Sequence, residues 1–357
     1  MSIDMLTIPA QCVTESRIQE LDYNNIEFGK IFSDHMFVVD YKDGAWQNPQ
    51  IMPYGPMSLN PATSALHYGQ AIFEGMKAYR DANGDILMFR PVDNLNRLNI
   101  SAERMCMPAL PEDLFMQGLE QLLRLDAAWV PPTSGCALYL RPFMFATDDF
   151  IGVRPSATYR FIIFSCPVGA YYGQALKVAI EPQFVRSAEG GAGYAKAAGN
   201  YGAALLPARK MQDKGYHQLI WTDAKEHKYI EESGTMNVMF VIDGKLITPP
   251  VSTTILKGIT RDSVLTLARE LGYTVEERKV AITELVEAHK AGKLQEAFGT
   301  GTAATIAQIA TIHYDGTDMD LPAVEGREIS NRLATELDKI KTGQAPDPLN
   351  WVQRINL

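Results

Sequence analysis

A chain of 357 residues with 46% hydrophobic and 21% charged residues has the composition of a folded globular protein of about two domains. Its net charge of −9 lacks the basic footprint that nucleic acids require and argues against binding to anionic membranes. The four cysteines form no C-x-x-C pair, and no apolar run approaches the ~18 residues of a membrane helix. The N-terminus has neither a basic nor an apolar segment, so we expect a cytoplasmic protein without a targeting peptide.

The first half of the chain predicts strands, hairpin turns and two helices. Strands are expected at residues 36–41, 76–79, 86–90, 137–145 and 159–165, with a proline-rich loop at 49–61. Asp93 is expected to cap a helix with Leu95 and Leu98 on its apolar face, and Pro111 to open a second helix. Residues 167–176 have the composition of a linker, which places a domain boundary there.

The second half predicts more strands and four helices. Strands are expected at residues 177–181, 216–222, 228–231, 237–242, 245–248, 275–281 and 295–298. Helices are expected from about residue 203, from Thr260, from Thr283, and along a last apolar stripe that ends at Gly343. We expect an N-terminal domain at 1–166, an interdomain loop at 167–176 and a C-terminal domain at 177–357. The class is α/β in the broad sense (α+β), because meandering strands outnumber strict βαβ units.

A glycine-rich stretch, residues 190–202, surrounds a single lysine, Lys196. The stretch carries no second charge, so desolvation is expected to lower the pKa of Lys196 and favour its neutral amine. Such amines form Schiff bases with carbonyls and with pyridoxal phosphate (PLP). The stretch matches neither a P-loop nor the dinucleotide G-x-G-x-x-G pattern. A flexible loop with a solvated lysine stays an equal alternative on this stretch alone.

PLP needs further groups from a protein, and the chain offers candidates for each. Tyr201 is a donor for the phenolic oxygen, and a carboxylate at 231–232 is a partner for the pyridine nitrogen. The phosphate has two candidate loops, 258–260 before a helix and 299–303, with Arg90 as a bidentate partner. Taken alone, Tyr201 is more typical of simple packing and the carboxylates of a solvated turn, and each phosphate loop is equally typical of an ordinary cap or turn. The six histidines show no metal-ligand spacing, so no metal site is expected.

Longer motifs run in order from about residue 25 to the C-terminus. They occupy residues 28–30, 34–36, 66–68, 73–78, 89–91, 139–142, 166–171, 196–202, 232–237, 258–261 and 298–303. In this order they resemble the branched-chain aminotransferases, which are fold-type IV PLP enzymes. The resemblance implies a small N-terminal α/β domain and a larger C-terminal domain with a β pseudo-barrel. Ala304 and Ala307 stand where mammalian members carry a redox C-x-x-C, so no thiol switch is expected.

The resemblance also implies roles for the residues that contact the cofactor. Lys196 is implied to be the Schiff-base lysine and the proton carrier. Glu232, rather than Glu231, is implied to pair with the pyridine nitrogen, and Tyr201 to bind the phenolic oxygen. The remaining cofactor-binding residues implied by the family motifs are Arg90, Thr235, Ile259, Thr260 and Thr302.

A substrate pocket is implied in the same way. Its side-chain walls are implied to be Phe28, Phe73, Tyr139 and Tyr171. The α-carboxylate is implied to bind near Thr235, Thr302 and Ala303, and Arg141 to help accept the second carboxylate of glutamate. Tyr68 and Val153 are implied to come from the partner subunit of a homodimer.

We therefore expect a PLP-dependent transaminase that moves the amino group of L-leucine, L-isoleucine or L-valine to 2-oxoglutarate. The nearest alternatives are a D-amino-acid aminotransferase and an aminodeoxychorismate lyase, against which Tyr139 and Arg141 argue. A catalytically silent PLP-binding protein is a third possibility, disfavoured by the intact lysine, glutamate and phosphate motifs. A Rossmann-type dehydrogenase is the weakest alternative, because the dinucleotide pattern is poorly matched.

Overall fold

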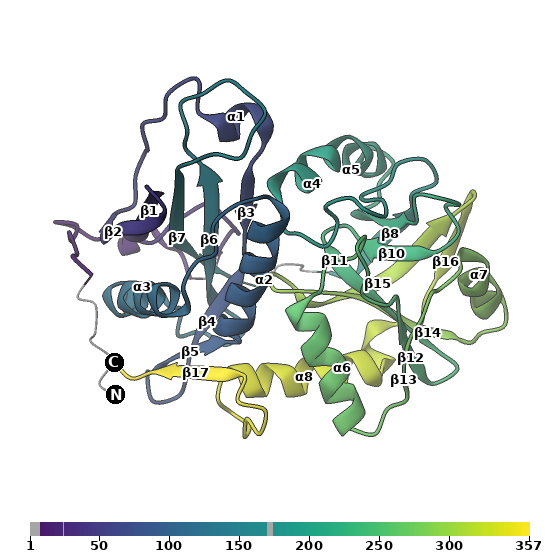
Figure 1. Ribbon diagram of the computed structural model, residues 1–357. Helices are drawn as coiled ribbons and strands as arrows, with labels where there is room; N and C mark the ends of the chain where they lie inside the picture. Colours follow the sequence, from purple (N-terminus) through teal and green to yellow (C-terminus); the bar gives the residue numbers. More distant parts are fainter. Residues whose placement is uncertain (1–7, 24, 170–173) are drawn as a thin grey trace. The chain divides into compact units, whose positions relative to one another are not determined.

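The structure, a computed structural model, describes residues 8–23, 25–169 and 174–357 and contains two compact units (Figure 1). The first unit comprises Met1–Tyr171, Ala195–Gly199 and Ile340–Leu357, and the second comprises Tyr172–Tyr194 and Asn200–Lys339. These units differ from the expected domain ranges in two places. The last residues group with the first unit because the C-terminal strand pairs within its sheet, and the short segment around Lys196 also packs on that unit.

The first unit is built on an antiparallel sheet. In the described residues this sheet has eight strands, in the order β17-β5-β4-β6-β7-β1-β2, with β3 paired to β6. The strands are β1 (His35–Lys42), β2 (Ala45–Pro53), β3 (Ala71–Phe73), β4 (Met76–Arg80), β5 (Ile86–Phe89), β6 (Ala137–Ala146), β7 (Tyr159–Val168) and β17 (Val352–Ile355). Hairpin turns join β1 to β2 and β4 to β5, whereas α2 and α3 lie between β5 and β6.

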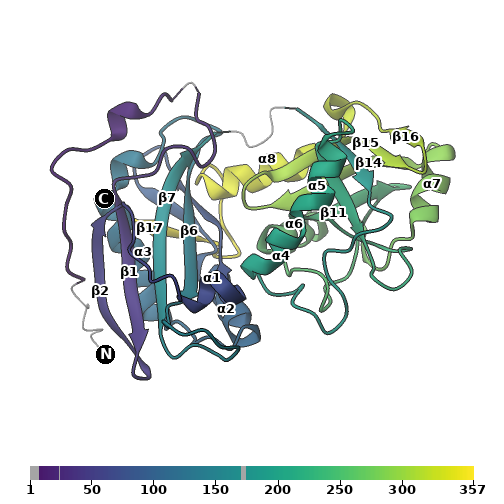
Figure 2. The same cartoon turned by 90° about the horizontal axis from the view of Figure 1, so that it is seen from above.

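Two helices, α2 (Pro91–Arg104) and α3 (Glu112–Leu125), cover one face of this sheet (Figures 1 and 2). Their apolar stripes enter the core, where Leu98 is fully buried. At Gly118 of α3 an added Cβ would lie 2.7 Å from the Phe37 ring, so only glycine lets the helix approach β1 this closely. The shorter helices of this unit are η1 (Ile18–Glu20), α1 (Ser64–Tyr68) and η2 (Ala127–Trp129).

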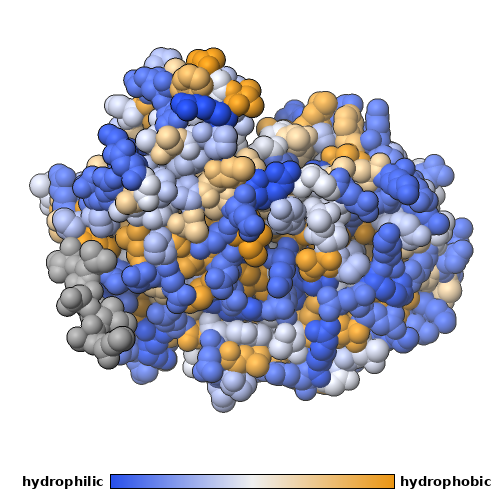
Figure 3. Space-filling model, in the orientation of Figure 1, coloured by the Kyte–Doolittle hydropathy of each residue, from blue (hydrophilic) through white to orange (hydrophobic). Residues whose placement is uncertain are grey.

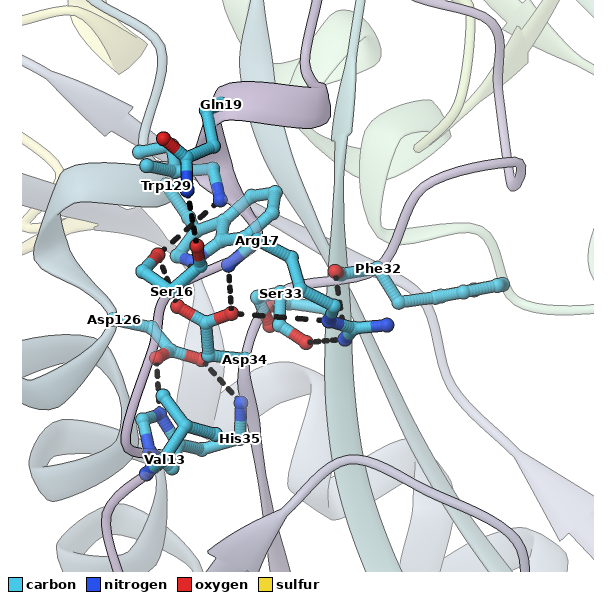
Figure 4. Close-up of polar contacts among 12 residues, drawn as sticks. Val13, Ser16, Arg17, Gln19, Phe32, Ser33, Asp34, His35, Asp126 and Trp129 are labelled. Atoms are coloured by element: carbon cyan, nitrogen blue, oxygen red, sulfur yellow. Dashed lines mark hydrogen bonds and ion pairs between the residues drawn. The ribbon is translucent and has the colours of Figure 1, made fainter.

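A buried aspartate, Asp34, joins the N-terminal segment to the core of the first unit (Figure 4). Its carboxylate accepts hydrogen bonds from Ser16 Oγ at 2.6 Å, the Arg17 backbone N–H at 2.9 Å and Trp129 Nε1 at 2.8 Å. Burial opposes ionisation of Asp34, yet these hydrogen bonds outweigh it, so the pKa of Asp34 lies below its ordinary value. The charged carboxylate is therefore a fixed point that orders residues far apart in the sequence.

The next residue, His35, fastens a second part of the same segment (Figure 4). The Val13 backbone N–H donates to His35 Nε2 at 3.0 Å, so Nε2 carries no proton. The proton is therefore on Nδ1, which donates to Asp126 Oδ1 at 2.6 Å. Burial raises the pKa of Asp126, although the contacts with His35 act in the opposite direction.

The second unit contains a closed barrel. Within the described residues its sheet has nine strands, and a further pairing of β10 with β11 closes the six strands β10-β9-β8-β15-β14-β11 into a ring. The strands are β8 (Leu176–Ile180), β9 (Gln218–Thr222), β10 (Ile230–Ser233), β11 (Met236–Ile242), β12 (Lys245–Thr248), β13 (Val275–Glu277), β14 (Leu294–Gly301), β15 (Thr305–Tyr314) and β16 (Thr317–Asp320). This barrel confirms the expected β pseudo-barrel of the C-terminal part.

Helices pack around the barrel, and its core is formed by buried side chains such as Val238, Phe240 and Ile309. The helices are α4 (Ala198–Ala203), α5 (Leu205–Gln212), α6 (Ile259–Glu270), α7 (Ile282–Lys290), η3 (Val324–Gly326) and α8 (Ile329–Lys341), of which α4 and α8 continue across the unit boundaries. None of the helices in the described ranges has both the length and the apolar character required to cross a membrane.

Some strands differ from the sequence prediction. The loop expected at 49–61 begins later, because β2 continues to Pro53; β2 is an edge strand, where a proline interrupts no central hydrogen-bond ladder. The carboxylates at 231–232, expected between strands, lie within β10, and residues 299–301, expected in a loop, lie within β14. Pairing with distant strands, which no local pattern reveals, extends both elements.

The first residues of four helices also differ from the sequence prediction, by one to three positions. Helix α2 begins at Pro91, so Asp93 lies in the first turn rather than at the cap. Helix α3 begins one residue after Pro111, and α6 begins at Ile259, one residue before the expected cap Thr260. Helix α7 begins at Ile282 with Ala281 as its cap, in place of the expected Thr283. Hydroxyl and carboxylate residues are favoured both at caps and in first turns, which explains the ambiguity.

We predict that Asp34→Asn lowers the free energy of unfolding by about 1–3 kcal/mol, because an amide cannot accept all of the hydrogen bonds that converge on this position. A carboxylate with a lowered pKa stabilises the folded state above its unfolded pKa of about 3.9, and this contribution is lost as the pH falls through the folded pKa. Urea unfolding from pH 7 to pH 3 measures the free energy of unfolding of the wild type and of Asp34→Asn. The difference between the two free energies should be constant above about pH 4 and should shrink below it.

Glu336→Gln is the matched control. Glu336 forms a surface ion pair with Lys339, so its replacement should change stability by at most about 0.5 kcal/mol. An Asp34→Asn protein as stable as this control at pH 7 would contradict the proposed importance of Asp34.

Candidate active site

Lys196 is held through its backbone by the first unit. Its N–H donates to Ser101 Oγ at 2.9 Å, and its carbonyl accepts the Phe73 N–H at 3.1 Å. Ala197 forms a bridge with Ile72, so the segment adds a short strand-like pairing to the edge of β3. The ammonium nitrogen lies 5.0 Å from the centre of the Phe73 ring, within cation–π distance. The lysine in the glycine-rich stretch is therefore firmly anchored through its backbone.

Helix α2 connects this anchor to Arg90. Ser101 Oγ, which accepts the Lys196 N–H, itself donates to the Arg97 carbonyl. Arg90 caps the other end of the helix with φ 52°, a backbone conformation that is uncommon outside glycine and often found at functional sites. Its side chain pairs with Asp93 at 2.7 Å, and its N–H donates to the Trp351 carbonyl at 2.7 Å. The C-terminal segment thus helps to orient Arg90.

A buried ion pair supports the strand that carries Phe73. Glu74 is fully buried and accepts two hydrogen bonds of 2.7 Å from the Arg97 guanidinium. This bidentate geometry offsets the cost of burying both charges. At Gly75 an added Cβ would lie 2.2 Å from the phenolic oxygen of Tyr139, so glycine is required for the two strands to approach.

Four of the predicted substrate residues form one cluster in the first unit. The Tyr139 ring packs edge-on against Phe28 with centroids 5.1 Å apart, and its hydroxyl accepts a hydrogen bond from Arg141 at 3.0 Å. The Arg141 guanidinium also lies 4.7 Å from the centre of the Phe73 ring. No carboxylate among the described residues forms an ion pair with Arg141, and its buried Nε has no hydrogen-bond partner there. The cluster combines aromatic surfaces with a positive charge that no carboxylate in the described part of the chain neutralises.

Two other predicted substrate residues, Tyr68 and Val153, lie outside this cluster. Tyr68 on α1 is 40% exposed, and Val153 in the loop between β6 and β7 is 90% exposed, so neither is buried in this cluster. Tyr171 lies outside the described residues. Exposure of Tyr68 and Val153 is compatible with their predicted contact with a partner subunit.

In the second unit, Glu232 is a buried carboxylate surrounded by donors. It is only 4% exposed. Its Oε1 accepts hydrogen bonds from Asn237 Nδ2 at 2.9 Å and from the Leu256 N–H at 3.3 Å. Its Oε2 lies 2.6 Å from Arg186 Nε, although the N–H bond is not aligned with the oxygen, so this contact is an ion pair. Three separate segments therefore stabilise one negative charge.

Helix α6 begins beside this carboxylate. An added Cβ at Gly258, its cap, would lie 1.9 Å from Asn237 Oδ1, so the helix start can reach β11 only with glycine there. The next two residues, Ile259 and Thr260, are buried in the first turn, where peptide N–H groups have no partner within the helix. Such a helix start binds anions, phosphate above all.

The remaining predicted cofactor residues of the second unit are spread over two turns and a helix. Thr235 is exposed in the turn between β10 and β11, which Gly234 makes with φ 57°. Thr302 and Ala303 are half-buried in the turn between β14 and β15. Tyr201 is half-buried in α4. Neighbouring Thr300 has a buried hydroxyl without a hydrogen-bond partner among the described residues, as does Ser233.

Comparison with known proteins decides the family. The family model for amino-transferase class IV matches residues 71–312. The chain belongs to the class IV aminotransferases. It is 43% identical over 347 residues to branched-chain-amino-acid aminotransferase 2 of Bacillus subtilis, covering 96% of each chain. It is also 43% identical to the branched-chain-amino-acid aminotransferase of Mycolicibacterium smegmatis, covering 95% of each.

Solved structures of class IV relatives have the same fold. The branched-chain aminotransferase of Escherichia coli is 26% identical, with a TM-score of 0.74 and coverage of 91% of this chain and 99% of that one. The enzyme of Thermobaculum terrenum in its PLP form is 26% identical, with a TM-score of 0.73 and coverage of 90% and 98%. These comparisons confirm the predicted fold-type IV architecture.

The residues of this class IV chain fit PLP. The start of α6 offers peptide N–H groups, and the buried hydroxyls of Thr300 and Ser233 lack partners among the described residues, so both suit a ligand rich in acceptor oxygens. Glu232 suits a protonated ring nitrogen, because its buried carboxyl group is an acceptor for an N–H donor. Lys196 carries a primary amine of the kind that forms a Schiff base with PLP.

Several residues that shape the site escaped the sequence analysis. Ser101 anchors Lys196, Arg97 holds Glu74, and Arg186 faces Glu232. Each meets its partner through a contact between distant segments, and none belongs to a motif with a local signal. A search for arginines near the lysine stretch would have singled out Arg186 alone, because it is the nearest arginine before that stretch.

We predict that Gly75→Ala lowers the free energy of unfolding by about 1–3 kcal/mol, because the new methyl group would overlap the Tyr139 hydroxyl. In a Tyr139→Phe background the same substitution should cost less, because the nearest atom is absent. Urea unfolding of the four proteins in this double-mutant cycle gives the coupling energy. Gly55→Ala is the control, since a Cβ there meets nothing within 4 Å. Equal costs in the two backgrounds would refute the steric explanation.

Proposed function

We propose that this chain catalyses PLP-dependent transamination of L-leucine, L-isoleucine and L-valine with 2-oxoglutarate, giving branched-chain 2-oxo acids and L-glutamate. The observation that carries the proposal is the 43% identity, over 96% of both chains, to a protein named as a branched-chain aminotransferase. Such similarity along the whole length favours a shared reaction over a fold shared for another purpose. The anchored lysine, the buried carboxylate and the helix start add the chemistry that this reaction requires.

Lys196 would act as the acid–base group of the reaction. Bound PLP supplies a carbonyl for the amino group and a ring that withdraws electrons from the reacting carbon. The Lys196 amine would take the proton from the substrate Cα and return it to the cofactor carbon that receives the amino group. Its backbone is held by Ser101 and Phe73, so only the side chain needs to move between these positions.

The remaining cofactor contacts would hold the ring in place. Glu232 would keep a proton on the pyridine nitrogen, and the Tyr201 hydroxyl would bind the phenolic oxygen. The N–H groups of Ile259 and Thr260, at the start of α6, would bind the phosphate together with Arg90 and Thr302. Arg90 already pairs with Asp93, so the phosphate would share this guanidinium.

The proposed substrate residues have side chains suited to both an apolar and an acidic substrate. The aromatic surfaces of Phe28, Phe73 and Tyr139 suit a branched apolar side chain, and Tyr171 is proposed as a further wall. Arg141 would accept the second carboxylate of glutamate. Residues proposed to bind the α-carboxylate are Thr235, Thr302 and Ala303.

A homodimer is proposed as the active form, with Tyr68 and Val153 reaching the neighbouring site. Figure 3 shows hydrophobic side chains gathered at the end of the first unit that carries α1. Leu66, Tyr68, Phe150, Ile151 and Val153, in α1 and the loop after β6, are exposed large hydrophobic residues. A group of this kind on a protein surface favours contact with another chain. The expected cytoplasmic location stays a prediction.

We predict that L-leucine, added without an oxo acid to the purified protein with PLP, abolishes the visible absorption band of the bound cofactor. 2-Oxoglutarate should restore the band. Lys196→Ala should lower turnover by at least about 10²–10⁴-fold, because the acid–base group is lost. Steady-state kinetics with each branched-chain amino acid measures this loss.

Lys214→Ala, at an exposed position after α5, is the control and should keep wild-type turnover. A band that responds to D-amino acids but not to L-leucine would redirect the assignment to another class IV activity. Near wild-type turnover in Lys196→Ala would overturn the role of this lysine.

We predict that Arg141→Met slows the half-reaction with L-glutamate about 10- to 100-fold more than the half-reaction with L-leucine. Hydrogen bonds to a charged group contribute about 1.5–3 kcal/mol, and only glutamate carries a side-chain carboxylate. Stopped-flow measurement of the cofactor band with each amino acid separates the two rates. Arg124→Met, at a surface arginine paired with Glu120, is the control and should change neither rate. An equal loss for both amino acids would remove Arg141 from glutamate recognition.

A further inference from the structure

Arg186 is a nearly buried arginine whose contacts all lead to the surroundings of Glu232. Its side chain is 10% exposed, and Nε lies 2.6 Å from Glu232 Oε2. Its Nη2 donates to the Gly193 carbonyl at 3.0 Å and to the Thr254 carbonyl. At Gly193 an added Cβ would lie 2.7 Å from that Thr254 carbonyl, so glycine is needed for these segments to converge. These contacts fix the position of the guanidinium, in contrast to the mobile side chain of a typical surface arginine.

The loop that carries Arg186 is itself ordered by a carboxylate. Glu181, at the end of β8, is 3% exposed. Its Oε1 accepts the N–H groups of Gln183 at 2.8 Å and Phe184 at 3.0 Å. These bonds fix the turn that leads the chain from the barrel to Arg186.

A second carboxyl group, Glu231, lies in the same network. Thr254 Oγ1 donates to Glu231 Oε1 at 2.5 Å, and the Thr254 carbonyl accepts from Arg186. Burial raises the pKa of Glu231, and the nearby Arg186 charge opposes this only in part. Arg186 pairs directly with Glu232 at 2.6 Å and shares only Thr254 with Glu231, so Glu232 is the carboxylate that the guanidinium contacts.

We propose that Arg186 is a positioning residue that keeps a proton on the pyridine nitrogen of bound PLP by holding Glu232 in its charged form. The inference rests on the proposed function, because it assigns Glu232 to that nitrogen. Arg186 touches Glu232 and acts on the cofactor only through it.

Arg186 would act on the equilibrium of one proton that the ring nitrogen and Glu232 share. The proton lies either on the ring nitrogen, beside a carboxylate, or on Glu232, beside a neutral ring. Both states contain the same atoms, and only the position of the proton differs. A guanidinium 2.6 Å from Oε2 stabilises the carboxylate and therefore the protonated ring. Loss of that charge removes a stabilising partner of the buried carboxylate, so the balance shifts toward the protonated carboxyl group.

The experiment uses the full-length protein reconstituted with PLP labelled with ¹⁵N at the ring nitrogen. The ¹⁵N chemical shift distinguishes a protonated from an unprotonated pyridine and does not depend on turnover. We expect the wild-type signal at the protonated position. Arg186→Met should move it toward the unprotonated position, and Arg186→Lys, which keeps the charge, should leave it near the wild-type value.

Arg327→Met is the matched control. Arg327 is a buried arginine of the same unit that donates to the carbonyls of Ala297, Ile309 and Pro322 and to Gln308. This variant should lose thermal stability and keep the protonated ¹⁵N signal. A shift in Arg327→Met equal to that in Arg186→Met would overturn the proposal, because general loosening of the unit would then explain both.

The outcomes separate this inference from the proposed function. Wild-type protein that binds no PLP would overturn the proposed function and the inference with it. Wild-type and Arg186→Met proteins with the same protonated signal would overturn only the inference. If Arg186→Met does not fold, Arg186→Gln replaces it, since glutamine keeps a donor for the Gly193 and Thr254 carbonyls. An unprotonated nitrogen in the wild type would overturn the inference without any variant.

Discussion

The donors that a buried carboxylate needs constrain the second unit. Removing Glu232 from water is costly unless donors surround it, and the donors come from the loop after β8, from β11 and from the segment before α6. These segments can converge only where glycine leaves room, at Gly193 and Gly258. The glycine-rich stretch therefore has a structural purpose besides freedom around the lysine: it lets backbone approach Thr254 closely.

The first unit also contains a buried carboxylate, and there an ion pair compensates for the loss of water. Glu74 and Arg97 neutralise each other with bidentate geometry, and Arg97 lies one helical turn before Ser101. Because Ser101 binds the Lys196 backbone, the same helix that carries the ion pair also fixes the reactive lysine. In both units, a carboxylate–guanidinium pair lies next to a residue proposed to act on the cofactor. Such pairs specify one arrangement of segments more than they add net stability.

Local sequence patterns predict much of this fold because local forces determine many of its elements. The turns at 43–44, 83–84 and 243–244 each join paired strands, and their glycines have positive φ as the hairpin pattern requires. The long ordered motifs also predict the family and the barrel. Pairings between distant segments leave no such signal: β17 joins β5, and Glu232 lies inside a strand because β10 pairs with both β9 and β11.

In the candidate site, too, local motifs predict some residues and contacts between distant segments determine the others. Lys196, Glu232 and Arg90 stand in recognisable motifs, but the residues that hold them do not. Ser101 belongs to no recognisable motif in α2, and it becomes important only because the fold brings Lys196 to it. Packing and hydrogen bonding between distant segments decide such partners, and a periodicity or a spacing within one segment contains no information about them.

Arg141 indicates how one pocket can suit both a branched apolar side chain and a carboxylate. Its guanidinium is stabilised by the Phe73 and Tyr139 rings and by the Tyr139 hydroxyl, and by no carboxylate among the described residues. Aromatic faces stabilise the cation while leaving its charge available, whereas an ion pair would neutralise it. An apolar substrate would then pack against the same rings without leaving the arginine unsupported, and glutamate would gain the unused charge. The aromatic residues around Arg141 would thus serve both substrates.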